Sequence, residues 1–575
     1  MIIYLCYNNK NIQERDKFMN VAICCLSAKY IHASLAPWCL KSGVDLLCNN
    51  SINTKVFEFT INGNTNEFIN NICSYSPDII SFTCYIWNIT KTLDVCQKLK
   101  DLTNATIILG GPEVSYRAKD ILNNNSYIDY VLSGEGEETY PELLNKLKCK
   151  ESITTVAGLN YRNGEKVISV PEKEYTSTPP SPYTNDFYNN LKGRIAYIET
   201  SRGCPYRCAF CLSGRCSKLR FFDIEQVKCD IVNLANSGTQ TLKFVDRTFN
   251  ANEKRANEII KFILDNRGVN IPENICFHFE IAGDILKEST IQLLKSAPIG
   301  LFQLEIGMQS FNEDTLKAIN RKTNTSILKK NIKRLVEFNN MHIHIDLIAG
   351  LTGEDFDSFK ESFNTGYSLK AHMLQMGFLK LLYGSDMREN PDKYPCKFTT
   401  DPPYEVTETP WLSANELHSL KLCEDALDRL YNSGRFIKSL DYLITECGFE
   451  PFDVFYQFGN MINGCKMTLS QYAEHFYTFF KDNVNVNCDL FREYILWDML
   501  CCSSSLQIPD SIKIKEPLYR QAKRKLTEGT SDKIKVAVLP HMGKILVVNQ
   551  SAKKDLHGRY PFELYKIDII NAPEE

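Results

Sequence analysis

Residues 195–211 have the sequence IAYIETSRGCPYRCAFC, a short apolar strand followed at once by a loop with three cysteines. Three residues separate Cys204 from Cys208, two separate Cys208 from Cys211, and the aromatic Phe210 precedes the last cysteine. Three thiolates on one loop suit three irons of a four-iron cube, because thiolate is the protein ligand that iron–sulfur clusters prefer. The fourth iron is then without a protein ligand, which is typical of a catalytic cluster rather than of a simple electron carrier.

A structural zinc site and buried core cysteines are the competing interpretations of this loop. Structural zinc takes four ligands, and no partnered fourth Cys or His follows at a suitable spacing. Cys216 is close, but it stands in a loop of different character. The chain has 22 cysteines, and most fall in apolar stretches, as expected of small buried side chains in a reducing compartment. Only the three cysteines of the loop have ligand spacing.

The chain that follows the cysteine loop alternates strands with helices. Counting the first one, we expect strands at Ile195–Thr200, Thr241–Asp246, Cys276–Ala282, Leu301–Gly307, His342–Ala349 and Met373–Leu381. Helical patterns lie between them, at 224–235, 254–266, 285–295, 326–338 and 355–369. Parallel strands with right-handed helical crossovers close towards a barrel, whose strand ends usually carry function. A single polar residue at such an end can also cap a helix or satisfy a backbone group.

The first ~170 residues form a different α/β pattern. We expect strands at 21–26, 55–59, 78–84, 106–109 and 127–133. The last two strands run into the turns Gly110–Gly111–Pro112–Glu113 and Gly134–Glu135–Gly136–Glu137. An open α/β sheet binds ligands beyond the carboxyl ends of its strands, whereas glycine there also serves tight turns. Two glycine turns followed by acidic residues favour a ligand site on a doubly wound, Rossmann-like domain.

Together these motifs resemble the B12-binding radical S-adenosylmethionine (SAM) proteins, over residues 20–385. The resemblance implies an α/β protein with a B12-binding-type domain over 19–170, a linker over 171–194 and a partial (β/α)6 radical SAM barrel over 195–385. A C-terminal substrate or capping domain over 386–575 is expected to be mainly helical, with a helix at 414–430 and a hairpin of 535–539 with 544–549. The aromatic residues of 443–463 are interpreted as core.

For the barrel, the resemblance implies a [4Fe–4S] cluster on the three cysteines that cleaves SAM to a 5′-deoxyadenosyl radical. The segment Glu305–Phe311 matches the family's Gln-x-Gly-x-Gln-Ser, with Glu305 in place of glutamine. The segment Asp346–Glu354 matches Asp-Leu-Ile-x-Gly-Leu-Pro-Gly-Glu, with Thr352 in place of proline. The SAM contacts implied in this way are Phe210, Asp246, Glu280, Glu305, Gln309, Asp346, Gly350 and Leu351.

For the N-terminal domain, the resemblance implies cobalamin contacts at Thr83, Tyr85, Gly110, Gly111, Pro112, Glu113, Gly134, Glu135, Gly136 and Glu137. One departure matters. The Asp-x-His-x-x-Gly motif that supplies a histidine to cobalt is absent, and His32, the only histidine before residue 200, has unmatched surroundings. Two interpretations stay open: cobalamin binds without that ligand, or the fold persists without cobalamin.

Three functions are compatible with these motifs, and the two enzymatic ones act on a small molecule. The favoured interpretation is a lyase that releases queuine from queuosine or its 5′-phosphate in queuosine salvage, because the subgroup with this domain order and C-terminal extension resembles those lyases. The alternative is a cobalamin-dependent radical SAM methyltransferase, and the non-enzymatic alternative is a B12- or redox-sensing module. The substrate of the lyase would be a modified nucleoside. An electron donor such as flavodoxin or ferredoxin and anaerobic conditions are also expected.

The bulk composition limits the partners. The net charge of −3 provides no global field for a polyanion, so no long nucleic acid is expected. The basic stretch of 513–525 is interpreted as a solvated helix face. No run of ~18 apolar residues exists, so we expect no membrane span and a cytoplasmic protein. Whether translation starts at Met1 or Met19 is left open.

Overall fold

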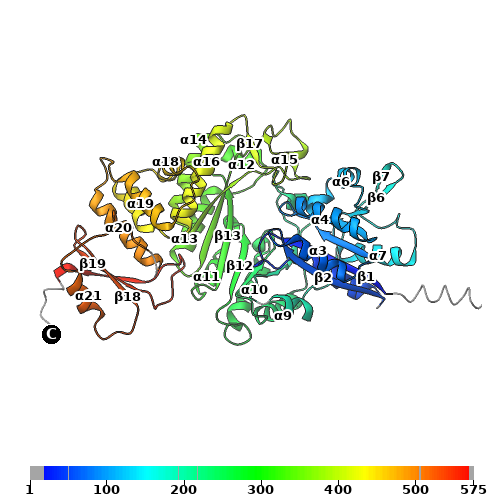
Figure 1. Ribbon diagram of the computed structural model, residues 1–575, viewed down its shortest axis with the longest axis horizontal. Coiled ribbons are helices and arrows are strands. Elements are labelled where there is room, and N and C mark those ends of the chain that lie inside the picture. Colours follow the sequence, from blue (N-terminus) through cyan, green and yellow to red (C-terminus); the bar gives the residue numbers. More distant parts are fainter. Residues whose placement is uncertain (1–17, 49–50, 192, 216–217, 504–506, 569–575) are drawn as a thin grey trace, which may run out of the picture. The chain divides into compact units, whose positions relative to one another are not determined.

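The computed structural model describes residues 18–48, 51–191, 193–215, 218–503 and 507–568 (Figure 1). The chain divides into two compact units. The first comprises Met1–Glu280, Lys380–Tyr394 and Phe398–Val406, and the second Ile281–Leu379, Pro395–Lys397 and Thr407–Glu575. The choice between Met1 and Met19 as the start concerns residues 1–17, which lie outside the described ranges.

The first unit opens with a seven-stranded sheet of order β2-β1-β3-β4-β5-β6-β7. Neighbouring strands from β2 to β5 are parallel, whereas β6 and β7 add an antiparallel hairpin that the sequence pattern does not predict. The strands are β1 (Met19–Ser27), β2 (Ile52–Thr60), β3 (Ile79–Thr83), β4 (Thr106–Gly110), β5 (Tyr130–Leu132), β6 (Leu159–Asn163) and β7 (Lys166–Ser169). All five expected strands are present.

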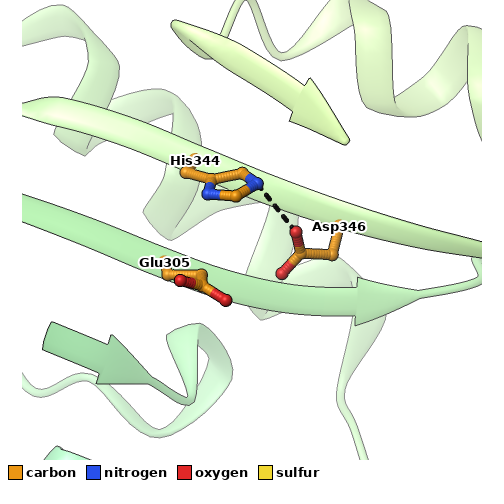
Figure 2. Close-up of side chains that lie close together, drawn as sticks. All are labelled: Glu305, His344 and Asp346. Atoms are coloured by element: carbon orange, nitrogen blue, oxygen red, sulfur yellow. Dashed lines mark ion pairs between the residues drawn. The ribbon is translucent and has the colours of Figure 1, made fainter. Parts of the chain in front are cut away.

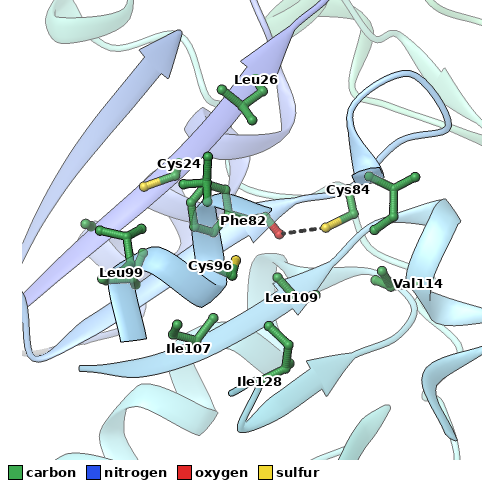
Figure 3. Close-up of a cluster of buried hydrophobic side chains, with 14 of the residues drawn as sticks. Cys24, Leu26, Phe82, Cys84, Cys96, Leu99, Ile107, Leu109, Val114 and Ile128 are labelled. Atoms are coloured by element: carbon green, nitrogen blue, oxygen red, sulfur yellow. Dashed lines mark hydrogen bonds between the residues drawn. The ribbon is translucent and has the colours of Figure 1, made fainter. Parts of the chain in front are cut away.

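Helices cover both faces of this sheet. On one face pack α2 (Ala36–Leu47) and α7 (Gly136–Cys149), and on the other α3 (Thr65–Ser74), α4 (Ile89–Leu102) and α6 (Ala118–Asn124), with the short α5 (Pro112–Ser115) before α6. In α4 the buried Val95, Cys96 and Leu99 form one apolar stripe, because residues three and four apart share a helix face. Figure 3 shows Cys96 and Leu99 packed with Phe82 and Ile107 of the sheet. The expected doubly wound fold is confirmed.

The expected linker of 171–194 contains one helix, α8 (Asn185–Leu191). Phe187 of this helix is 1% exposed and packs edge-on against Trp38, with ring centroids 5.6 Å apart. The Pro- and Ser-rich composition indicates a linker, but this tertiary contact gives a helix a reason to form.

The six expected barrel strands are all present, three in each unit. In the first unit β8 (Ala196–Ile198), β11 (Thr241–Phe244) and β12 (Cys276–Ile281) are parallel, and α9 (Ile224–Ala235) and α10 (Glu253–Asn266) follow β8 and β11 along the chain. In the second unit β13 (Phe302–Gln309), β14 (His342–Ala349) and β15 (Met373–Phe378) are parallel, with α11 (Glu288–Lys295) preceding them and α12 (Glu313–Ala318), α13 (Thr325–Glu337) and α14 (Phe356–Ser368) between them. Among the described residues, the strands of neither unit close into a barrel.

The C-terminal part of the second unit is mainly helical, as expected. Its elements are α16 (Ala414–Leu427), the π-helical turn η4 (Asp428–Asn432), α17 (Ile437–Asp441), η5 (Tyr442–Glu446), α18 (Pro451–Ile462), α19 (Leu469–Phe480), α20 (Cys488–Cys502) and α21 (Tyr519–Thr527). The expected hairpin is β18 (Ile534–Leu539) with β19 (Lys544–Asn549), and β20 (Phe562–Lys566) extends it to three strands. Phe452, Phe455 and Phe458 of α18 are at most 1% exposed, so these aromatic residues are core.

Within the described residues, none of the helices is both long enough and apolar enough to span a membrane.

Candidate functional site

The cysteine loop connects the two strands of a small antiparallel pair in the first unit. β9 (Ser201–Arg202) pairs with β10 (Arg220–Phe221), and Arg202 stands opposite Arg220 at the base of the loop. Gly203 has φ +98°, and a Cβ there would lie 2.8 Å from the Lys218 carbonyl oxygen, so only glycine suits this position. The pairing of β9 with β10 therefore holds the two ends of the cysteine loop together.

Within the described residues, none of the three cysteines of the loop forms a disulfide. Cys208 is 8% exposed, while Cys204 and Cys211 are half-buried, and the Cys211 N–H donates to the Cys208 carbonyl at 3.0 Å. The Cys204 Sγ lies 3.5 Å from the Thr248 Oγ1. Three thiols on one such loop fit the soft ligands that an iron–sulfur cluster takes.

Also in the first unit, a cavity of about 740 Å³ lies against the N-terminal sheet. This volume is within the range of cavities that hold small molecules and cofactors. Nine of the ten residues expected to contact cobalamin line it: Thr83, Tyr85, Gly110, Gly111, Pro112, Gly134, Glu135, Gly136 and Glu137. Tyr85 and Trp87 of the wall are stacked, with centroids 4.5 Å apart.

Backbone packing explains the glycines of this cavity. Gly111 has φ +107°, and a Cβ there would lie 2.6 Å from the Cys84 carbonyl oxygen, so the turn after β4 lies directly against the end of β3. At Gly136 a Cβ would lie 2.6 Å from Leu40 of α2. A side chain at Gly111 would push the turn away from the end of β3, whereas at Gly136 only the flexible end of the Leu40 side chain would have to move.

The tenth expected residue, Glu113, is not part of the cavity lining. Helix α5 begins at Pro112, and the Glu113 side chain is buried, where it accepts hydrogen bonds from Arg117 and Tyr404. Burial raises the pKa of this carboxyl. The Glu113 side chain is thus engaged within the protein, and its expected contact with cobalamin stays a prediction.

Two carboxylates and an imidazole meet on adjacent strands of the second unit (Figure 2). Glu305 on β13 is in direct register with His344 on β14, and Asp346 lies two residues further on the same face of β14. The His344 Nε2 lies 2.9 Å from the Asp346 Oδ1, and ligand atoms of all three residues lie within 4.8 Å of one another. Adjacent carboxylates of this kind accept hydrogen bonds from vicinal hydroxyls such as those of a ribose.

Three family models match successive parts of the chain. They are "B12 binding domain" over residues 44–144, "Radical SAM superfamily" over 198–365 and "Protein of unknown function (DUF4080)" over 392–575. The chain thus contains a B12-binding domain and a radical SAM domain. The expected family is thereby confirmed.

Curated relatives of this radical SAM protein include methyltransferases. It is 28% identical over 301 residues to the cobalamin-dependent radical SAM methyltransferase TokK of Streptomyces tokunonensis, covering 50% of this chain and 44% of TokK. It is 29% identical over 306 residues to a 2-(S-pantetheinyl)-carbapenam-3-carboxylate methyltransferase of Streptantibioticus cattleyicolor, again covering 50% and 44%. The chain thus spans less than half the length of these two relatives.

A solved structure shares the fold. The cobalamin-dependent SAM radical enzyme OxsB, with aqua-cobalamin and SAM bound, matches with a TM-score of 0.59 and 15% identity, over 84% of this chain and 79% of OxsB. The radical SAM domain implies a [4Fe–4S] cluster and SAM, and the B12-binding domain together with its cobalamin-bound structural neighbours supports cobalamin. When bound, the cluster would supply one-electron cleavage of SAM.

The remaining residues expected to contact SAM are placed as follows. Glu280, on β12, lies 3.7 Å from Lys243 on β11, and Phe210 is half-buried in the cysteine loop. In the second unit, Gln309 ends β13 with φ +70°, at an irregularity in the pairing with β14. Gly350, with φ +88°, and the fully buried Leu351 follow β14 directly. Their contacts with SAM stay predictions.

The Asp246 side chain accepts hydrogen bonds from nearby residues, which the sequence does not reveal. The carboxylate is 1% exposed and accepts hydrogen bonds from the Thr200 N–H at 3.0 Å, the Thr200 hydroxyl at 2.7 Å and the Ser201 hydroxyl. Burial raises its pKa to about 6 despite these bonds. Asp246 thus fixes the chain as it enters the cysteine loop, and its expected role near the methionyl amino group stays a prediction.

His344 is the site residue that the motif comparison misses. Its spacing of two from Asp346 on a strand could have indicated it, because alternate residues of a strand share a face.

Proposed function

We propose that this protein is a cobalamin-dependent radical SAM methyltransferase that acts on a small molecule. One observation carries the proposal. The cavity against the B12-binding sheet is lined both by the two glycine turns and by Arg202, which is two residues before Cys204. A methyl-carrying cofactor in this cavity would therefore lie beside the loop that carries the cluster ligands. Both curated relatives described above are methyltransferases, which supports the same reaction.

The proposed reaction balances with two molecules of SAM. One gives up its methyl group and becomes S-adenosylhomocysteine. The other takes one electron and yields methionine and a 5′-deoxyadenosyl radical, which removes a hydrogen atom from the substrate and becomes 5′-deoxyadenosine. The substrate radical gains the methyl group, and a second electron completes the turnover. A reductant such as flavodoxin or ferredoxin would supply both electrons.

Within this proposal the chain binds, orients and excludes water, while the cofactors carry the bond-breaking chemistry. The cysteine loop would hold the cluster, and the cavity would hold cobalamin. The pair of Glu305 and Asp346 would accept hydrogen bonds from the ribose of SAM, with His344 fixing the second carboxylate.

The lyase interpretation gains nothing from these observations. It rests on the domain order and the C-terminal extension, and the matching C-terminal model describes a domain of unknown function. Methyl transfer, the alternative from the sequence analysis, is better supported by the relatives. It therefore replaces the release of queuine as the favoured reaction. The sensor alternative predicts a protein that binds cobalamin yet never cleaves SAM.

An isotope experiment separates these functions. The anaerobically reconstituted, cobalamin-loaded protein is incubated with dithionite, SAM bearing a deuterated methyl group and a small-molecule extract of the source cells. Methyl transfer predicts a new metabolite carrying the deuterated methyl group, with equal amounts of S-adenosylhomocysteine and 5′-deoxyadenosine. Fragmentation of a substrate with deuterium in no product except methionine, together with 5′-deoxyadenosine and no S-adenosylhomocysteine, would reject the proposal in favour of a lyase.

A further inference from the structure

Arg202 joins the second glycine turn to the cysteine loop within the first unit. Its guanidinium donates to Glu137 at 2.7 Å, to Glu199 at 2.7 and 2.8 Å, and to Glu135. Charge-assisted bonds with a planar guanidinium fix orientation as well as distance. Because Cys204 follows two residues later, these bonds fix the backbone at the start of the loop.

Glu135 holds the other end of the loop as well. Its carboxylate also accepts a hydrogen bond from Arg220 at 2.7 Å, and Arg220 stands opposite Arg202 in the β9–β10 pair. The cysteine loop runs between these two arginines. One carboxylate of the glycine turn therefore fixes both the beginning and the end of the loop.

The same side chains form part of the cavity wall. Glu135, Glu137, Glu199 and Arg202 all line the cavity of about 740 Å³. The Glu137 side chain is 8% exposed and that of Arg202 20% exposed, so water screens their contact only partly. A ligand that fills the cavity would displace the remaining water from this wall, which strengthens ion pairs and hydrogen bonds at the lower local dielectric.

We propose that Glu135 and Glu137 are positioning residues for the cysteine loop rather than polar contacts to the corrin, and that Arg202 couples occupancy of the cavity to stability of the cluster. The proposal rests on the cofactor set of the proposed function, but not on methyl transfer itself. Coupling between two binding sites is reciprocal, so the cluster equally strengthens binding of cobalamin.

The test measures loss of the cluster to an iron chelator, followed by absorbance, in reconstituted protein with and without cobalamin. In the wild type, cobalamin slows the loss about tenfold, the effect expected when hydrogen bonds to charged groups are strengthened. In Glu137→Gln and Arg202→Gln, cobalamin changes the rate less than about twofold. Arg202→Lys gives an intermediate effect, because a lysine cannot replace the forked contacts.

Glu138→Gln is the matched control. Glu138 is the neighbour of Glu137 on α7, pairs with Lys173 at 2.9 Å at the surface and does not line the cavity. In the Glu138→Gln variant, cobalamin is expected still to slow loss of the cluster about tenfold. Thermal midpoints of all variants show whether the fold is kept, and the isosteric Glu137→Gln remains informative if Arg202→Gln does not fold.

Three results would overturn the inference: full protection in Glu137→Gln, equal loss of protection in Glu138→Gln, or no protection in the wild type. If the wild type shows no protection but still forms S-adenosylhomocysteine and 5′-deoxyadenosine, the coupling is wrong and the proposed function stands. If the wild type binds no cobalamin, both fail.

Discussion

His344 and Asp346 are joined through Nε2 and Oδ1 at 2.9 Å on one face of β14, opposite Glu305 on β13. The His344 side chain is 9% exposed and that of Asp346 17%, so the contact is largely removed from solvent. An imidazole in this place fixes which way the carboxylate points, as second-layer partners do for ligand-binding groups.

Replacing His344 with phenylalanine is predicted to weaken SAM binding about tenfold, because the contact of its imidazole with the Asp346 carboxylate, which fixes that carboxylate, is lost. Equilibrium dialysis of SAM against the reconstituted protein measures this. His344→Gln, which keeps a polar group beside Asp346, recovers part of the affinity. His475→Phe, on the exposed face of α19, is the control and leaves SAM affinity at the wild-type value. Unchanged affinity in His344→Phe would show that the contact has no role in SAM binding.

Glu354 is predicted to make the protein less stable as pH rises. Its side chain is fully buried, accepts hydrogen bonds from Ser310 and Ser362, and has its pKa raised by burial from 4.5 to about 7. Between these values the folded state keeps a proton that the unfolded state releases, so stability falls through this window and then levels off. The full difference corresponds to roughly 3 kcal/mol.

Thermal midpoints of wild type and Glu354→Gln at about pH 5 and about pH 8 test this linkage. The wild type is expected to lose more stability between the two pH values than the variant. Glu361→Gln, an exposed position on the same α14, keeps the wild-type pH dependence. If Glu354→Gln has the same pH dependence as the wild type, the raised pKa of Glu354 is wrong.

Asp246→Asn is predicted to lower the cluster content about twofold or more, because an asparagine amide turns one acceptor into a donor facing the donors of Thr200 and Ser201. The measurement is iron and sulfide per chain after reconstitution. The exposed Asp265→Asn on α10 serves as the control. Normal cluster content in Asp246→Asn, with SAM binding lost, would instead favour a direct contact with SAM.

Much of the fold follows from local pattern. The bounds of β14 and α9 agree with the expectation, because continuous apolar strands and helical stripes are encoded within a few residues. The sequence pattern does not predict the hairpin of β6 and β7, because both strands are short and mix polar with apolar residues, and only Leu159 and Asn160 are buried. Helix α8 depends on the packing of Phe187 against Trp38, a contact between distant parts of the chain.

The site residues also divide into those that local sequence predicts and those that depend on contacts between distant parts of the chain. Cysteine spacing and glycine turns are local; the glycine turns line the cavity, and the contacts of both motifs with the cofactors stay predictions. Glu113 is expected to contact cobalamin because it belongs to the turn that begins with Gly110 and Gly111, but the sequence does not reveal that its side chain accepts hydrogen bonds from Arg117 and from Tyr404, which is 291 residues away. His344 was missed because its meeting with Glu305 depends on the register of β13 and β14.

The central measurement is product formation by the reduced, anaerobically reconstituted protein with SAM, with and without cobalamin, in wild type and Cys208→Ala. Chromatography quantifies S-adenosylhomocysteine and 5′-deoxyadenosine. The proposed function predicts that the wild type forms S-adenosylhomocysteine only with cobalamin, and that Cys208→Ala forms no 5′-deoxyadenosine. If the wild type forms 5′-deoxyadenosine regardless of cobalamin and no S-adenosylhomocysteine, the methyltransferase proposal is contradicted.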